Sequence, residues 1–126
     1  MKITQLDHLV LTVKNIEITV SFYTSVLGMK KEVFGEGRIA LKFGEQKINL
    51  HTCDDNIQPR AMHATPGSAD LCFITDVPLD TTIKAVKFCG IEIIQGPVER
   101  TGARGKILSF YVRDPDGNLI EIATEL

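Results

Sequence analysis

The sequence predicts an α+β fold in which two βαβββ modules follow one another in tandem and form an open-barrel cleft. Two observations support this fold class. Strand-like and helix-like patterns come in the same order in both halves of the chain, and one common shift superimposes His8 on Asp70 and Gly28 on Gly90. A repeat of this length indicates two copies of one supersecondary unit, because each copy alone is too small to enclose a core.

The first module, about residues 3–53, has the pattern of a strand, a helix and three short strands. Residues 6–13 are apolar and β-branched on both parities, as in a strand that is covered on both faces. Asn15 can cap a helix over residues 16–27, and Gly28 follows where a left-handed C-terminal cap falls. Glycine-containing turn signals then separate strand candidates at residues 30–34, 38–43 and 47–53.

The second module, about residues 69–126, repeats this order after a connector at about residues 54–68 that lacks helical and strand periodicity. Pro78 can open a helix over residues 79–89, and Gly90 ends it. Residues 1–126 are therefore predicted to form a single domain. Its second-module strands are expected at residues 69–75, 91–94, 106–112 and 118–124.

The composition and charge argue against several classes of partner. The chain has 126 residues, 44% of them hydrophobic, a formal net charge of −2 and a pI of about 5.9, with dispersed lysines and arginines. This distribution offers no electrostatic footprint for a nucleic acid or an anionic membrane. No apolar run approaches the roughly 18 residues that a membrane span requires. We therefore expect a small molecule as the partner.

The cysteines predict the redox environment. Cys53, Cys72 and Cys89 are odd in number and contain no CxxC pair. Reduced thiols in a cytoplasmic protein fit this pattern better than a disulfide framework. Cys72 lies within an apolar run and is assigned to the core.

Strand parity places polar side chains on one face of each predicted sheet. His8 lies opposite the more uniformly apolar positions of its strand, which a helix can cover. The same alternation of side chains places polar groups of three further strands on the corresponding faces. These groups are Asn49 and His51 on one strand, Asp70 on the next, and Glu121 on the last. Because an unpartnered polar group on an apolar strand costs free energy, these groups call for a common partner.

A divalent cation would satisfy these groups. Imidazole and carboxylate ligands suit Zn²⁺, Mn²⁺, Fe²⁺, Ni²⁺ or Co²⁺ better than Ca²⁺. Any one of these residues, taken alone, is more often a half-exposed polar side chain than a metal ligand. Their placement at equivalent positions of the repeat nevertheless favours a metal site. The candidate ligands are His8, His51, Asp70 and Glu121. His63 lies in the connector and is interpreted as a solvated loop residue.

Residues 114–117, Asp-Pro-Asp-Gly, predict a type I turn, because proline suits its second position and glycine its fourth. The turn joins the last two strands and thereby determines where Glu121 lies.

Three segments carry a family resemblance: Leu-Asp-His-Leu-Val-Leu-Thr-Val at residues 6–13, the helix end at residues 21–29, and Asp-Pro-Asp-Gly-Asn-Leu-Ile-Glu at residues 114–121. They resemble the vicinal oxygen chelate superfamily of glyoxalases, bleomycin-resistance proteins and dioxygenases, and the resemblance covers nearly the whole chain. More narrowly, residues 43–51, 66–71 and 96–102 resemble the glyoxalase domain-containing protein 5 and virulence-associated glyoxalase-like group.

The resemblance implies paired βαβββ modules, a divalent metal that substrate oxygens chelate, and frequent homodimers. By position, it makes His8 the first-strand ligand and Glu121 the closing ligand. The ligand of the second module falls on Asp70, where many members have histidine. The modules can pair within one chain or between two chains.

The sequence departs from glyoxalase I at the fourth strand. There glyoxalase I has a glutamate that is both ligand and proton-abstracting base, and the matching position holds Asn49. An amide cannot take a proton near neutral pH. His51, two residues on, is therefore a candidate ligand or base, and Glu121 is the other catalytic candidate.

Several residues are candidates for contact with the substrate. Asn49 belongs to this group, and the anionic groups of a substrate are expected to meet Arg100, Arg104 or Arg38. Residues 101–105 have the composition of a mobile loop able to cover the cavity, and equally of an exposed β connection.

Two classes of function fit these residues. The first is a metal-dependent glyoxalase-like enzyme, either a lyase, an isomerase or a thiol transferase, whose small substrate binds the metal through vicinal oxygens. Fosfomycin-type transferases have a similar His, His, Glu set, which Asp70 matches only weakly. The second is a metal-free sequestering protein of the bleomycin-resistance type. Such members tend to lack metal residues, so His8, Asp70 and Glu121 argue against it.

Overall fold

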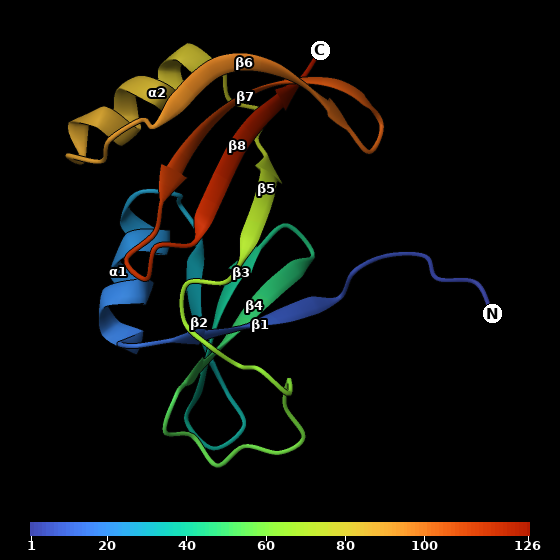
Figure 1. The fold of residues 1–126 in the computed structure, drawn as a ribbon, viewed down its shortest axis with the longest axis vertical. Coiled ribbons are helices and arrows are strands. Elements are labelled where there is room, and N and C mark those ends of the chain that lie inside the picture. Colours follow the sequence, from blue (N-terminus) through green and yellow to red (C-terminus); the bar gives the residue numbers. More distant parts are fainter. The chain divides into compact units, whose positions relative to one another are not determined.

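The computed structural model describes residues 1–126, which form two compact units, Met1–Pro66 and Gly67–Leu126. Each unit contains one four-stranded sheet and one helix in the order βαβββ (Figure 1). The predicted fold class is thus confirmed. Neither helix is long and apolar enough to cross a membrane.

The first unit has a mixed sheet with the strand order β1-β4-β3-β2, in which β1 runs parallel to β4. The helix α1 begins as predicted after Asn15, whose side chain accepts a hydrogen bond of 2.8 Å from the amide of Ile18. Gly28, at a φ of +72°, allows the chain to turn back into the sheet. The elements are β1 (His8–Val13), α1 (Ile16–Ser25), β2 (Lys30–Phe34), β3 (Arg38–Phe43) and β4 (Gln46–Thr52).

The core of the first unit lies between α1 and one face of the sheet. Phe22 and Tyr23 of α1 are buried, with their ring centroids 5.1 Å apart in an edge-to-face arrangement. The sheet contributes Leu11, Leu41 and Ile48, which are also buried. Burial of each such side chain contributes roughly 2 kcal/mol. The opposite face of the sheet is left for polar side chains.

The second unit repeats this plan with the strand order β5-β8-β7-β6 and a parallel β5–β8 pair. Figure 1 shows β8 between β5 and β7, and α2 beside β6 and β7. Val86 of α2 and Phe110 and Ile120 of the sheet are buried in its core. The elements are β5 (Asp70–Ile74), α2 (Leu79–Phe88), β6 (Gln95–Gly102), β7 (Gly105–Arg113) and β8 (Leu119–Glu125). His8 and Asp70 begin equivalent strands, as the repeat predicted.

The prediction of a strand at residues 91–94 is wrong. The amide of Ile91 bonds back to the carbonyl of Val86, residues 91–94 then form an irregular link in which the amide of Ile94 bonds to the carbonyl of Tyr111, and β6 begins only at Gln95. The isoleucines at positions 91, 93 and 94 suggested a strand. The true strand β6 was missed because it is a largely exposed edge strand without an apolar period.

The prediction of a mobile loop at residues 101–105 is wrong too, and the alternative prediction, an exposed β connection, is correct. Thr101 pairs with Lys106 and Gly102 with Gly105, which leaves only two residues in the turn of the β6–β7 hairpin.

The turn at residues 114–117 forms as predicted, with a 3.0 Å bond from the Gly117 amide to the Asp114 carbonyl. The buried Asp114 carboxylate also accepts bonds from the amides of Asp116 and Asn118 and from the Asn118 side chain, at 2.9, 3.0 and 2.8 Å. Asn118 in turn accepts a bond of 2.8 Å from the amide of Ala69. The turn therefore ties β7 and β8 to the start of β5.

Replacing Asp114 by alanine is expected to destabilise the protein, because three donors lose their acceptor in a buried position. We expect the free energy of unfolding to fall by about 3 kcal/mol, measured by denaturant titration. The exposed Asp54→Ala removes the same charge and serves as the control. Equal stability of the two variants would contradict this account of the turn.

Candidate functional site

The first sheet brings three of the predicted residues onto one face. The parallel register of β1 and β4 places His8 beside Lys47, Val10 beside Asn49, and Thr12 beside His51. His8, Asn49 and His51 therefore lie on the face opposite the buried Ile48 and its apolar neighbours, as strand parity predicted.

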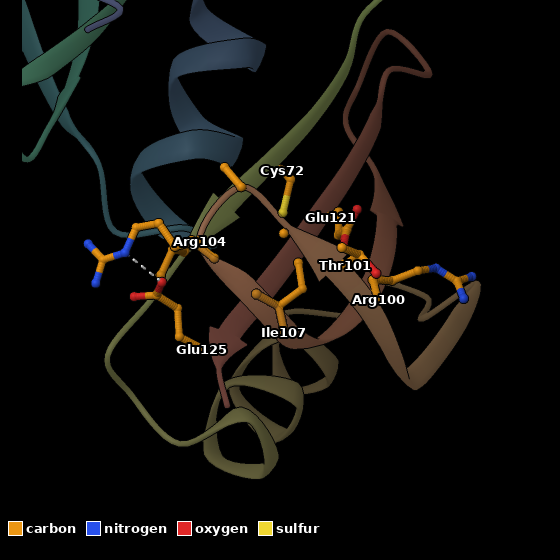
Figure 2. Close-up of a pocket in the computed structure, with 10 residues that line it drawn as sticks. Cys72, Arg100, Thr101, Arg104, Ile107, Glu121 and Glu125 are labelled. Atoms are coloured by element: carbon orange, nitrogen blue, oxygen red, sulfur yellow. Dashed lines mark ion pairs between the residues drawn. The ribbon is translucent and has the colours of Figure 1, made fainter. Parts of the chain in front are cut away.

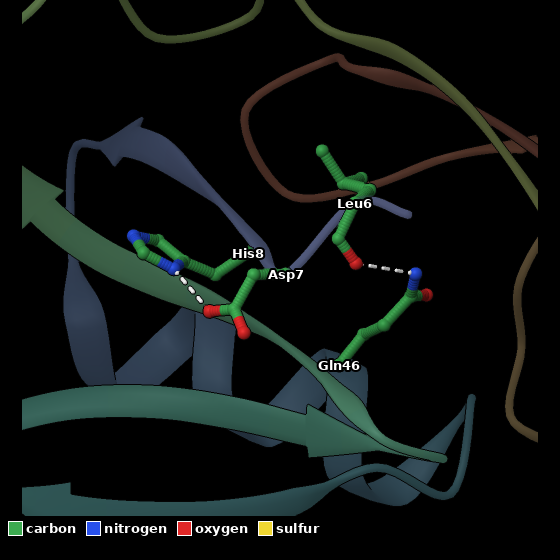
Figure 3. Close-up of polar contacts among 4 residues, drawn as sticks. All are labelled: Leu6, Asp7, His8 and Gln46. Carbon is green, nitrogen blue, oxygen red and sulfur yellow. Dashed lines mark hydrogen bonds and ion pairs between the residues drawn. The ribbon is translucent and has the colours of Figure 1, made fainter. Parts of the chain in front are cut away.

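His8 is an exposed histidine at the start of β1, oriented by its neighbour. Its Nδ1 lies 2.8 Å from Oδ2 of Asp7 (Figure 3). In the same view, Gln46 donates a bond of 2.8 Å to the carbonyl of Leu6, which anchors the chain that enters β1. A carboxylate on one ring nitrogen fixes the orientation of a histidine and directs the other nitrogen outward. His8 thus has the arrangement that metal-bound histidines commonly show.

Asn49 and His51 are buried polar residues, only 5% and 6% exposed. The Oδ1 of Asn49 and the Nε2 of His51 have no hydrogen-bond partner. Burial lowers the pKa of His51, and the guanidinium groups of Arg38 and Arg60 lower it further against the opposing effect of Asp55. His51 is therefore a neutral imidazole with an unused nitrogen, a form that suits a metal ligand or a proton acceptor.

The second sheet carries the corresponding polar face. The register places Cys72 of β5 beside Glu121 of β8, and Glu121 beside Tyr111 of β7. The hydroxyl of Ser109 donates a bond of 2.5 Å to Oε2 of Glu121. Asp70, the first residue of β5, lies on this face and is exposed. The two carboxylates predicted as ligands therefore share a face, with Glu121 the more firmly held.

Cys72 was assigned to the core, and this is wrong, because it lies on the exposed side of β5. Partial burial raises the pKa of its thiol to about 11, together with the charge of Glu121 and a hydrogen bond to that carboxylate. The thiol is thus a protonated neighbour of Glu121. Cys53 and Cys89 are likewise free of disulfides.

A hollow of about 440 Å³ opens on this face (Figure 2). Arg104 and Arg100 extend to opposite sides of it, with Cys72 and Glu121 between them. Arg104 pairs with Glu125 at 3.2 Å, whereas Arg100 donates a bond of 2.9 Å to the hydroxyl of Tyr111 and has no carboxylate partner. Arg100 is therefore the cation in the hollow that can still bind an anion. The lining residues are Cys72, Ile74, Arg100, Thr101, Gly102, Ala103, Arg104, Ile107, Glu121 and Glu125.

No three histidine, cysteine or acidic side chains come together in a metal-binding group. Within each unit the predicted residues share one face, and their donor types suit a divalent cation: imidazole nitrogens in the first unit, one of them without a partner, and carboxylates in the second. The sequence analysis missed Ser109 and Tyr111. Their polar parity on β7, between the apolar positions 108, 110 and 112, was the available signal.

These features define a class: proteins in which two βαβββ units each present a polar sheet face opposite their helix. The family model for the Glyoxalase/Bleomycin resistance protein/Dioxygenase superfamily matches residues 5–122, and the chain belongs to this superfamily.

Similar proteins support the same membership. Virulence protein STM3117 of Salmonella typhimurium is 54% identical over 98% of this chain and 85% of its own length. Glyoxalase domain-containing protein RDO1 of Mycosarcoma maydis is 48% identical over 98% of this chain and 70% of its own length. The structure of an integron cassette protein from V. cholerae is 59% identical with a TM-score of 0.99, over 100% of this chain and 98% of that one.

Two more distant proteins carry the names of enzymes. Metallothiol transferase FosB of Shouchella clausii is 29% identical over 94% of this chain and 79% of its own length. A lactoylglutathione lyase structure from Agrobacterium tumefaciens has a TM-score of 0.74 over 98% of this chain and 95% of that one, and at 23% identity it shows the fold alone.

Replacing Glu121 by glutamine removes a charge beside the Cys72 thiol and so lowers its pKa toward the ordinary value. We expect iodoacetamide to alkylate Cys72 faster in Glu121→Gln than in the unmodified chain at about pH 8, measured by mass spectrometry. Cys53 in the same samples is the internal control and should react equally in both proteins. An unchanged rate at Cys72 would contradict the contact between these two side chains.

The lowered pKa of His51 predicts a pH dependence of stability in the metal-free protein. Because the folded pKa lies below the unfolded value of about 6.5, the unfolded chain binds the proton first as the pH falls. The stability that the protein has above about pH 6.5 is therefore partly lost on acidification, as His51 becomes protonated in the unfolded chain. We expect the decrease in unfolding free energy between about pH 7.5 and 5.5 to be smaller in His51→Gln. Equal decreases in both proteins would contradict the prediction.

Proposed function

We propose that the chain is a divalent-metal-dependent glyoxalase-like enzyme, a lyase, isomerase or thiol transferase, acting on a small substrate that binds the metal through vicinal oxygens. The observation that carries this proposal is His51, a buried and neutral imidazole whose Nε2 has no hydrogen-bond partner. Such a nitrogen costs free energy unless a metal ion or a proton donor satisfies it.

The proposed metal ligands are His8 and His51 of the first sheet and Asp70 and Glu121 of the second. The Asp7 carboxylate supports His8 in this role because it holds the ring by Nδ1. Nitrogen and carboxylate donors of this kind suit Zn²⁺, Mn²⁺, Fe²⁺, Ni²⁺ or Co²⁺. Members of the superfamily often form dimers, and we include a cytoplasmic homodimer in the proposal.

A bound metal ion would supply Lewis-acid polarisation of the substrate oxygens. Glu121 and His51 are the proposed catalytic residues. The hydroxyl of Ser109 holds the Glu121 carboxylate in place, and His51, where it does not serve as a ligand, is neutral and able to accept a proton. Asn49 at the neighbouring position offers a hydrogen bond but no proton acceptor, which makes the base chemistry differ from that of glyoxalase I.

The arginines of the second unit are the proposed contacts for a substrate anion. Arg100 is favoured over Arg104, because Glu125 already neutralises Arg104, while the side chain of Arg100 donates only to neutral acceptors, the Tyr111 hydroxyl and the Glu99 carbonyl. The likeness to a protein named metallothiol transferase supports the transferase branch of the proposal.

A metal-free binding protein is the second candidate, and the hollow beside Glu121 favours it. Ile74 and Ile107 give the hollow apolar walls, and its size is sufficient for a small organic molecule. Such a protein would need none of the four proposed ligands, so metal retention separates the two functions.

Elemental analysis of protein purified without a metal-affinity tag is expected to show about one equivalent of a divalent metal per chain or per dimer. Titration of the metal-free form with Zn²⁺, Mn²⁺, Ni²⁺ and Fe²⁺ identifies the cation that binds most tightly. Glu121→Gln is expected to lose this binding and to keep its circular dichroism spectrum, because the change is nearly isosteric. Binding of no cation would leave the sequestering protein as the better account, and stoichiometric binding by Glu121→Gln would remove this residue from the ligand set.

A further inference from the structure

The polar face of the first sheet is strongly basic. Its twelve positions carry four basic side chains, Lys30, Arg38, Lys42 and Lys47, and one acidic side chain, Glu32. The nearest carboxylate contact on the face is between Glu32 and Lys42, at 4.0 Å. Lys30, Arg38 and Lys47 have no carboxylate partner. The face thus holds three cations whose charge is not neutralised within the sheet, and Arg38 and Lys47 lie nearest to its buried centre.

Both of these cations contact the same aromatic ring. The guanidinium of Arg38 lies 4.7 Å from the ring centroid of Phe34, and the Nζ of Lys47 lies 3.7 Å from it. Phe34 pairs with Arg38 across β2 and β3, whereas Lys47 pairs with Lys42 at the other end of β3. The ring that touches both therefore reaches across the intermediate row, in which Ala40 pairs with Asn49.

The intermediate row is buried and unsatisfied. Ala40 is fully buried. Asn49 is 5% exposed, and its Oδ1 has no hydrogen-bond partner. A buried amide oxygen without a donor is destabilising. The row between Arg38 and Lys47 thus contains an acceptor that the protein itself leaves without a donor.

We propose that this face binds a small α-hydroxycarboxylate. Its carboxylate contacts Arg38 and Lys47, and its hydroxyl donates a hydrogen bond to Oδ1 of Asn49, while the Phe34 ring turns aside. The ligand then satisfies both cations and the unpartnered acceptor at once, which a simple carboxylate or a neutral diol does only in part. The neighbouring carboxylate and hydroxyl oxygens are vicinal, so the assignment names the part of the substrate that the first unit binds and leaves Arg100 for a second anionic group of the substrate. The assignment rests on the proposed function only for the ligand being a substrate.

The test uses metal-free, full-length protein and three matched probes, followed by nuclear magnetic resonance titration. Lactate carries both groups, propionate lacks the hydroxyl, and 1,2-propanediol lacks the carboxylate. We expect lactate to bind roughly tenfold more tightly than propionate, as one hydrogen bond within a charged site predicts, and propanediol to bind least. Shifts should concentrate on β2, β3 and β4.

Variants assign the contacts. Arg38→Gln and Lys47→Gln are each expected to weaken lactate binding roughly tenfold. Asn49→Leu should make lactate and propionate bind equally, and retained propionate binding shows that this variant is folded. Lys31→Gln is the matched control, since it removes the same charge from an exposed residue of β2 on the opposite face.

Each alternative result is decisive. No lactate binding, binding that Lys31→Gln weakens as much as Arg38→Gln does, or a lactate preference that survives Asn49→Leu would overturn the inference. Its failure is distinguishable from failure of the proposed enzyme: metal binding without lactate binding overturns this ligand class alone, and lactate binding without metal binding overturns the metal-dependent function alone.

Discussion

The arrangement of functional groups depends on the register of two parallel strand pairs, β1–β4 and β5–β8. Because side chains alternate along a strand, a slip by one residue would turn every polar group of that strand into the helix-covered core. In the first unit the register is secured by the buried Ile48 and Leu50, which must face α1. The polar positions of His51 and Asn49 are consequences of this apolar requirement, so the core and the candidate site are specified by the same alternation.

The polar groups of the two faces differ in how they are partnered. In the second unit the groups satisfy one another: Ser109 donates to Glu121, Tyr111 holds Arg100, and Glu125 pairs with Arg104. In the first unit Asn49 and His51 stay unsatisfied next to cations that have no carboxylate partner. Since an unsatisfied buried group is destabilising, the first face bears the larger folding cost, and a ligand there regains more free energy than one on the second face.

Most of the fold follows from local signals in the sequence. The Asn15 cap, the Gly28 turn and the shared order of the halves predicted both helices and seven of the eight strands, because these elements bury one face and so show a period. The strand β6 escaped detection because an exposed edge strand has no such period. The contacts of Phe34 with Arg38 and Lys47 were also out of reach, since they join three strands and depend on how the sheet curves. Parity predicts which face a side chain takes, and only the structure reports what it touches.

The replacement of an acidic base by Asn49 is consistent with the charge of its surroundings. A carboxylate at this position would stand in the row between the cations Arg38 and Lys47 and would neutralise them from within the protein. The amide keeps the same shape and an accepting oxygen but no charge. Both cations therefore remain available to an anion from outside. In the proposed function, Asn49 recognises a hydroxyl group of the ligand and removes no proton.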